Sequence, residues 1–252
     1  MQEIASIINR YSIGKFRVSQ VNLRRAVAYI SQCINNGKYG YICVSNARVA
    51  YQSNNDTEYC TIQNNSLLTV PDGKPLVWIA HNIGLKDVGQ VAGNELFHAL
   101  LIESKKNGYS HYFYGSTPST IATMSKKMSV DYPGVELKGA VSPPFQPIEA
   151  YDINALAEEI NHKAPTFLWI GLGAPKQERL MALLQPKLKK TICIGVGLVF
   201  EYYAGTVKRA PNWARKLGLE WLVRTLQQPK RLKMFAIPFM WTIKEVLKSK
   251  FK

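Results

Sequence analysis

Short apolar segments alternate with amphipathic stretches through most of this sequence, and this alternation constrains the fold more than any other feature. Five segments have the length and composition of buried strands: 40–45, 66–70, 111–115, 166–171 and 191–197. Five stretches have helical periodicity: 75–83, 94–106, 120–130, 153–160 and 176–184. Strands that alternate with helices favour a mostly parallel sheet with helices on both faces. The sequence therefore predicts an α/β fold of Rossmann-like architecture.

Positive charge is concentrated at one end of the chain. The 252 residues carry a formal net charge of +15, and residues 205–252 supply +10 of it, with twelve Lys and Arg against two Glu. This end has the pattern of helices, over 212–228 and 229–250. We therefore expect two domains, an α/β domain over 1–204 and a basic helical appendage over 205–252. Such an excess indicates an anionic partner: nucleic acid, a phospholipid surface or a phosphate-rich substrate.

Cysteine usage and hydropathy bear on the compartment. The four cysteines lie far apart without a C-x-x-C pair, which fits thiols in a reducing compartment, although a disulfide stays open. The N-terminal residues lack the apolar stretch of a signal peptide. The longest mostly apolar stretch near the other end, 234–243, has ten residues and is too short to cross a bilayer. We expect a cytoplasmic protein.

Small or polar residues follow the predicted strands, at the sheet edge where parallel sheets bind ligands. The segments are Ser45-Asn46, Pro71-Asp72-Gly73, Gly115-Ser116, Gly171-Leu172-Gly173 and Gly195-Val196-Gly197. Glycine lets backbone N–H groups approach a phosphate or a sugar. A single glycine after a strand is more often only a turn. The five segments together indicate a ligand site.

The turn after the fourth strand matches a dinucleotide-binding turn only in part. Its G-x-G at 171–173 requires a third glycine at position 176, where Lys176 stands after Pro175. This difference disfavours a nicotinamide cofactor.

Asp72 and Asn46 each allow two interpretations. Asp72 in a Pro-Asp-Gly turn fits a structural turn residue, and equally a general base that is ionised at neutral pH. Asn46 fits a helix cap, or a side chain that orients a sugar hydroxyl.

Motifs for metal binding and covalent catalysis are missing from the sequence. The four histidines have no metal-ligand spacing, and neither a Walker motif nor a G-x-S-x-G elbow occurs. No D-x-D is present, which disfavours a metal-dependent diphosphate site. We therefore expect no metal and no cofactor.

Several ordered motifs resemble the WecG/TagA/CpsF glycosyltransferases (glycosyltransferase family 26). The most specific is "GLGAPKQE" at 171–178, which is similar to the family's G-x-P-K-Q-E signature. The others are "PDGKPLVW" (71–78), "VAGNEL" (91–96), the glycine turn, helix and Y-P-G strand of 112–139, and "GVGLVFEYYAGTVKRAPNWARKLGLEWLVRTLQQPKRL" (195–232). The resemblance runs from about Tyr41 to Leu232.

This resemblance implies an inverting, metal-independent hexosyltransferase. It would move a sugar from a UDP-sugar donor to a sugar on a polyprenyl diphosphate, in the synthesis of teichoic-acid-like or other cell-surface polysaccharides. It also implies an α/β catalytic domain, and an appendage that lies on an anionic membrane surface and completes the active site. The enzyme would be peripheral on the inner face of the cell membrane. A homo-oligomer is compatible with the sequence.

The resemblance also implies roles for single residues. Asp72 matches the catalytic base, Asn46 an active-site asparagine, Gln177 a glutamine of the substrate pocket and Glu201 an acidic residue that binds the uridine. Gly171 and Gly173 would form a close-approach turn.

Arg224 and Arg231 match two arginines of the appendage that reach the active site. A third arginine of the family falls on Met234, beside Lys233, so the question arises whether Lys233 replaces it. Gln90 stands where relatives commonly have arginine. "SPPF" at 142–145 replaces a glycine-tyrosine loop.

Other interpretations stay open for the appendage. Arg224 and Arg231 fit a solvated helix face as well as a substrate site. The tail aromatics suit either a core or a membrane interface: Trp213, Trp221, Phe235, Phe239 and Trp241. A basic nucleic-acid-binding α/β protein is the alternative function, but no nucleic-acid-binding motif is present, so we expect no nucleic-acid partner.

Overall fold

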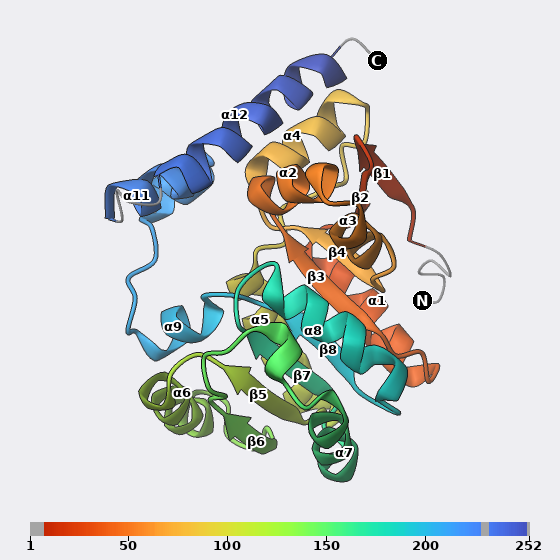
Figure 1. The fold of residues 1–252 in the computed structure, drawn as a ribbon, viewed down its shortest axis with the longest axis vertical. Helices are drawn as coiled ribbons and strands as arrows, with labels where there is room; N and C mark the ends of the chain where they lie inside the picture. Colours follow the sequence, from red (N-terminus) through yellow and green to blue (C-terminus); the bar gives the residue numbers. More distant parts are fainter. Residues whose placement is uncertain (1–7, 228–231, 251–252) are drawn as a thin grey trace.

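The centre of the molecule is a six-stranded parallel sheet (Figure 1). The computed structural model describes residues 8–227 and 232–250, with the backbone alone for Lys216, Trp221, Arg224, Leu226, Gln227 and Lys233. The strand order is β4-β3-β8-β7-β5-β6. The strands are β3 (Tyr41–Ser45), β4 (Leu68–Pro71), β5 (His111–Gly115), β6 (Leu137–Val141), β7 (Phe167–Gly171) and β8 (Ile192–Gly195).

Helices cover both faces of this sheet, so the predicted fold class is confirmed (Figure 1). One face packs against α1 (Leu23–Asn35), α5 (Gly93–Asn107), α6 (Pro118–Asp131) and α9 (Val199–Ala204). The other packs against α7 (Ile153–Lys163) and α8 (Lys176–Leu184). Successive residues of a strand face opposite sides: Trp169 enters the first core, Leu168 and Ile170 the second. Burial on both faces explains why the strands other than the edge strand β6 are mostly apolar.

The N-terminal region forms a third core beside the sheet. It contains the antiparallel hairpin of β1 (Arg10–Ile13) and β2 (Phe16–Ser19), with α2 (Ala47–Asn55), α3 (Thr57–Asn64) and α4 (Lys74–Asn82). Two short 3-10 turns, η1 (Ile148–Ala150) and η2 (Gln185–Lys187), complete the body. The hairpin, α1 and α3 were not predicted from the sequence.

The basic end of the chain is helical, as predicted. It forms α10 (Asn212–Lys216), α11 (Glu220–Gln227) and α12 (Leu232–Ser249). The helix expected over 212–228 is divided near Gly218, which has a φ of +72°. α12 lies against α2 and α4 (Figure 1). There the Asn82 side-chain amide donates to the Val246 carbonyl at 3.0 Å, and Trp241 packs edge-on against Tyr51. None of the helices in residues 8–227 and 232–250 combines the length and the hydrophobicity that a transmembrane span requires.

The four cysteines are buried thiols without a disulfide: Cys33, Cys43, Cys60 and Cys193. Cys193 lies in the sheet core, and burial raises the pKa of its thiol to about 12. They act as small core residues, as the sequence predicts.

Candidate active site

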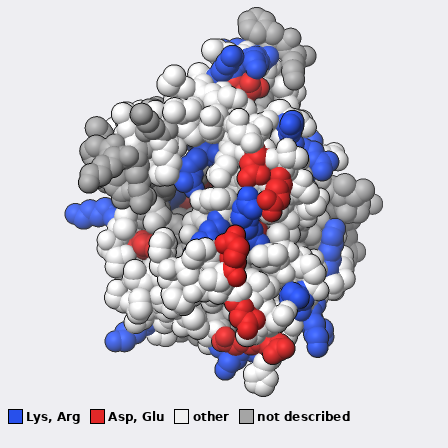
Figure 2. Space-filling model, in the orientation of Figure 1, with Lys and Arg blue, Asp and Glu red and all other residues white. Residues whose placement is uncertain are grey.

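A cavity of about 590 Å³ lies at the carboxyl ends of β3, β4, β7 and β8. Met234, Phe235 and Phe239 of α12 also line it, so body and appendage both contribute walls. In the space-filling view, Lys and Arg side chains lie in a depression of the face that is drawn (Figure 2). The lining includes six of the predicted site residues: Asn46, Asp72, Gly171, Gly173, Gln177 and Glu201.

Asn46 caps the N-terminus of α2. Its side-chain oxygen accepts hydrogen bonds from the backbone N–H groups of Arg48, at 3.1 Å, and Val49, at 3.3 Å. The capping interpretation therefore holds, and the residue lines the cavity at the same time.

Asp72 follows β4 and bonds beyond its own turn. Its backbone N–H donates to the Ser45 carbonyl at 2.8 Å, and its Oδ1 accepts from the Gly93 N–H at 3.2 Å. Gln90, which stands where relatives commonly have arginine, also lines the cavity, and its side-chain amide donates to the Asp72 carbonyl. The start of α5 thus holds one oxygen of this carboxylate.

The two glycines of the β7 turn have different reasons to be glycine. A Cβ at Gly171 would lie 2.6 Å from the Phe200 ring, so here the close approach is made by the protein's own core. Gly173 has a φ of +77°, a backbone conformation that favours glycine. Pro175 comes directly before α8, after a cis Ala174–Pro175 peptide bond. The Lys176 ammonium lies over the rings of Phe145 and Tyr151, at 5.0 and 4.9 Å from their centroids.

Gln177 ties two of the loops together. Its Oε1 accepts from the N–H of Gly173 at 3.1 Å and of Gly197 at 3.0 Å, which joins the turns after β7 and β8. Its Nε2 donates to Glu178 at 2.8 Å, and this bond fixes the orientation of the amide. The side-chain oxygen is therefore used within the protein.

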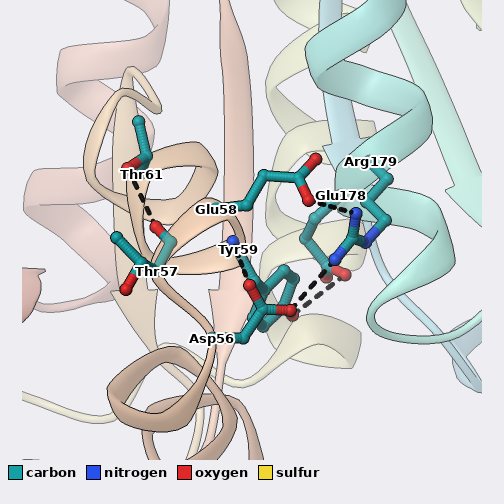
Figure 3. A network of polar contacts seen from close by, with 7 residues as sticks. All are labelled: Asp56, Thr57, Glu58, Tyr59, Thr61, Glu178 and Arg179. Carbon is teal, nitrogen blue, oxygen red and sulfur yellow. Dashed lines mark hydrogen bonds and ion pairs between the residues drawn. The ribbon is translucent and has the colours of Figure 1, made fainter.

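Glu178 follows Gln177 in the chain and joins it to Tyr59 of α3, and the contact with Tyr59 is drawn in Figure 3. It is fully buried, and desolvation raises the pKa of its carboxyl against the opposing bonds from Gln177 and Tyr59. The Tyr59 hydroxyl donates to it at 3.1 Å. The next residue, Arg179, pairs with Asp56 and Glu58, so α3 and α8 are joined both inside and at the surface.

Glu201 of α9 uses one carboxylate oxygen within the protein. Its Oε1 accepts from the Ser116 hydroxyl at 2.7 Å. Its Oε2 is buried, and no described residue bonds it. A buried carboxylate oxygen without a donor is costly, which makes it a place for a ligand donor group.

The cations of the lining differ in their partners. Arg209 donates two hydrogen bonds to the Glu95 carboxylate, of 2.7 and 2.8 Å, and Arg215 donates one to the same carboxylate at 3.0 Å. Burial alone would raise the pKa of Glu95, but these two arginines lower it. Arg48 instead donates to uncharged atoms, the Ala174 carbonyl at 2.9 Å and the Met234 sulfur at 3.4 Å.

Several lining residues were not assigned a role from the sequence. Arg48 carries no motif signal, and Lys74 and Arg209 lie in family stretches without an assigned function. Arg231 lies outside the described residues, and so do the side chains of Arg224 and Lys233, so their predicted contacts stay predictions. Within the described part of the chain, no three His, Cys, Asp or Glu residues gather as metal ligands would.

Comparison with known proteins identifies the family. Residues 11–252 match the Glycosyl transferase WecG/TagA/CpsF family. A protein of Bacillus subtilis (strain 168) is 28% identical over 219 residues, which cover 86% of this chain and 84% of the relative. A protein of Bacillus spizizenii (strain ATCC 23059 / NRRL B-14472 / W23) is 26% identical over 206 residues, which cover 81% of this chain and 78% of the relative. Both are named N-acetylglucosaminyldiphosphoundecaprenol N-acetyl-beta-D-mannosaminyltransferase. The chain belongs to the WecG/TagA/CpsF family and is a glycosyltransferase, as its motifs predicted.

Proposed function

We propose that this enzyme transfers a hexose-type sugar from a UDP-sugar to a sugar carried on a polyprenyl diphosphate, in the synthesis of a bacterial cell-surface polysaccharide. The names of both relatives support the acceptor, since each contains N-acetylglucosaminyldiphosphoundecaprenol. The observation that carries the proposal is the gathering of Asn46, Asp72, Gln177 and Glu201 around one cavity.

Asp72 is the general base in this proposal. Its carboxylate takes the proton of the acceptor hydroxyl, and the hydroxyl oxygen forms the new bond to the anomeric carbon of the donor. The bond from that carbon to the diphosphate breaks, and its electron pair leaves with UDP. Attack opposite the leaving group inverts the anomeric configuration. The Gly93 N–H supports this role because it holds one carboxylate oxygen in place.

Arg48 binds the leaving diphosphate in this proposal. Arg209 and Arg215 are paired with Glu95, whereas the hydrogen-bond partners of Arg48 are a carbonyl and a thioether. Exchanging such weak partners for phosphate oxygens strengthens the bonds of a guanidinium. Arg48 also contacts Met234, the position where the family's third arginine is missing. The charge would then come from the body of the enzyme, without a metal.

The appendage, residues 205–252, docks on an anionic membrane surface in this proposal, on the cytoplasmic side where the lipid-linked acceptor is presented. α12 has an exposed stripe at helical spacing that combines Ile237, Met240 and Leu247 with Lys244 and Lys248. Apolar and basic residues on one exposed helix face suit the interface of an anionic bilayer.

Ligand binding tests this function against its alternative, a nucleic-acid-binding protein. UDP at about one hundred times its dissociation constant stabilises the native state by about 2.7 kcal/mol, which raises the melting temperature of a domain of this size by roughly 5–10 °C. We expect this shift with UDP and none with a single-stranded oligonucleotide at the same salt. The reverse pattern would contradict the proposed function.

A further inference from the structure

Ser116, between β5 and α6, has a left-handed backbone conformation that is unusual for serine. Its φ is +58°, in the left-handed region that is strained for a non-glycine residue. Among the described residues, Ala164 is the other non-glycine residue with a positive φ, and it ends α7 with a bond from its N–H to the Ile160 carbonyl at 2.7 Å. Ser116 instead connects β5 to the cap of α6, Thr117.

The ends of two neighbouring strands, β6 and β7, hold Ser116 in this conformation. Its N–H donates to the Gly171 carbonyl at the end of β7, at 3.1 Å. Its carbonyl accepts from the Ser142 hydroxyl, directly after β6, at 2.7 Å. A Cβ at the preceding Gly115 would lie 2.5 Å from the Gly171 oxygen, so the ends of β5 and β7 approach closely here. The strain is therefore maintained by the body of the sheet.

The side chain of Ser116 serves the cavity. Its hydroxyl donates to Oε1 of Glu201 at 2.7 Å, which fixes the rotation of that carboxylate. Glu201 lines the cavity, and no described residue satisfies its buried Oε2. Ser116 is thus a strained residue that orients Glu201, a carboxylate with one oxygen bonded and the other left for a ligand. This arrangement is expected where a protein preorganises a binding site.

We propose that Ser116 is a positioning residue, which holds Glu201 so that Oε2 accepts a hydrogen bond from the nucleoside of the donor. This inference rests on the proposed function, in which that nucleoside is uridine. The ligand chemistry is an O–H or N–H donor, either a ribose hydroxyl or the N–H of the uracil ring.

Two variants separate positioning from structural support. Ser116→Gly and Ser116→Ala both remove the hydroxyl, but only alanine keeps the backbone strain. Ser116→Gly should therefore melt at the higher temperature of the two, by roughly 2–4 °C. UDP affinity, measured by calorimetry, should fall equally in both, by about tenfold or more, because Glu201 loses the bond that orients it toward the nucleoside. Ala164→Gly is the matched control: it relieves the same kind of strain away from the cavity and should leave UDP affinity unchanged.

A double-mutant cycle and analogues of UDP identify the contact. In a Glu201→Gln background, Ser116→Gly should have little further effect on UDP affinity. The wild-type preference for UDP over 2′-deoxy-UDP should shrink in Ser116→Gly if the donor group is a ribose hydroxyl. The preference over CDP should shrink if the donor group belongs to the base.

Three results would overturn the inference and leave the function standing. Ser116→Gly could bind UDP as tightly as wild type, or it could bind UDP more tightly than Ser116→Ala, in line with its higher stability. The third result is a reduced UDP affinity with the preferences over 2′-deoxy-UDP and over CDP both unchanged. A wild-type enzyme that does not bind UDP would instead overturn the proposed function.

Discussion

One oxygen of the Asp72 carboxylate is held by the N–H of Gly93, twenty-one residues away in the chain. Asp72→Asn should preserve this contact through the amide oxygen while removing the basicity. Loss of a general base costs on the order of 10²–10⁴ in rate. We expect transfer to fall by that factor and UDP affinity to stay within about twofold of wild type. Near-normal turnover of the folded variant would return Asp72 to a purely structural role.

Arg48 can be tested through the charge that it is proposed to supply. Arg48→Gln should weaken UDP binding by about tenfold or more and leave uridine binding nearly unchanged, since only UDP carries the diphosphate. The salt dependence of UDP binding should also fall. Arg179→Gln, which removes a surface cation outside the cavity lining, is the control. A higher KM for the lipid acceptor with unchanged UDP affinity would assign Arg48 to the lipid diphosphate instead.

At the scale of elements, His111 shows how the core of β5 depends on a neutral ring. The Trp169 N–H donates to Nδ1 of His111 at 2.8 Å, so Nε2 carries the proton toward the Ser104 hydroxyl at 2.9 Å. Burial lowers the pKa of His111 to about 3. The unfolded chain takes up a proton near pH 6.5, so the stability that the neutral ring provides is full above that pH and is lost as the pH falls toward 3.

The pKa difference of His111 between the folded and unfolded states predicts a measurable dependence of the unfolding free energy on pH. Between pH 8 and pH 5, protonation of the unfolded His111 should cost roughly 2 kcal/mol of unfolding free energy. His111→Gln keeps an acceptor and a donor but does not titrate, so urea unfolding at the two pH values should show a loss smaller by that amount. His162→Gln, at an exposed position of α7, should behave as wild type. Equal losses in wild type and His111→Gln would contradict the assignment.

The sequence identified the elements that have a strong local pattern. β3, β4, β5, β7 and β8 are apolar runs followed by small or polar residues, and each was predicted. The hairpin β1–β2 and α3 were not, because they are short and largely polar and their packing comes from distant residues. Asn46, Asp72 and Glu201 were found through strand ends and family motifs. The contacts of Arg48 with Ala174 and of Ser116 with Glu201 could not be found that way, since each joins positions far apart in the chain.

At the scale of the whole molecule, the proposed function requires that the cavity lie close to the membrane that holds the lipid-linked acceptor. Because α12 packs against α2 and α4, with Trp241 at the third core, deletion of the appendage would also uncover the body. Substitution of the exposed stripe is the cleaner test. Ile237→Ser with Met240→Ser should weaken flotation with anionic vesicles by about tenfold. Transfer to a water-soluble acceptor should persist.

Ile102→Ser, at an exposed apolar position of α5, is the control for this substitution, and high salt should weaken flotation of all variants. Flotation of the double variant at the wild-type level would show that the stripe of α12 is not the membrane contact.

The most direct measurement of the central claim is the mass of the product. The full-length enzyme is incubated with a panel of UDP-sugars and a short-chain polyprenyl-diphosphate sugar, in the presence of excess EDTA. The account predicts that one UDP-sugar adds a single sugar to the lipid-linked acceptor and that Asp72→Asn yields none of this product. Absence of any product across the panel in EDTA and with added Mg²⁺ or Mn²⁺, from an enzyme that is folded and binds UDP, would contradict it. Product that forms only when metal is restored would contradict the metal-independent mechanism.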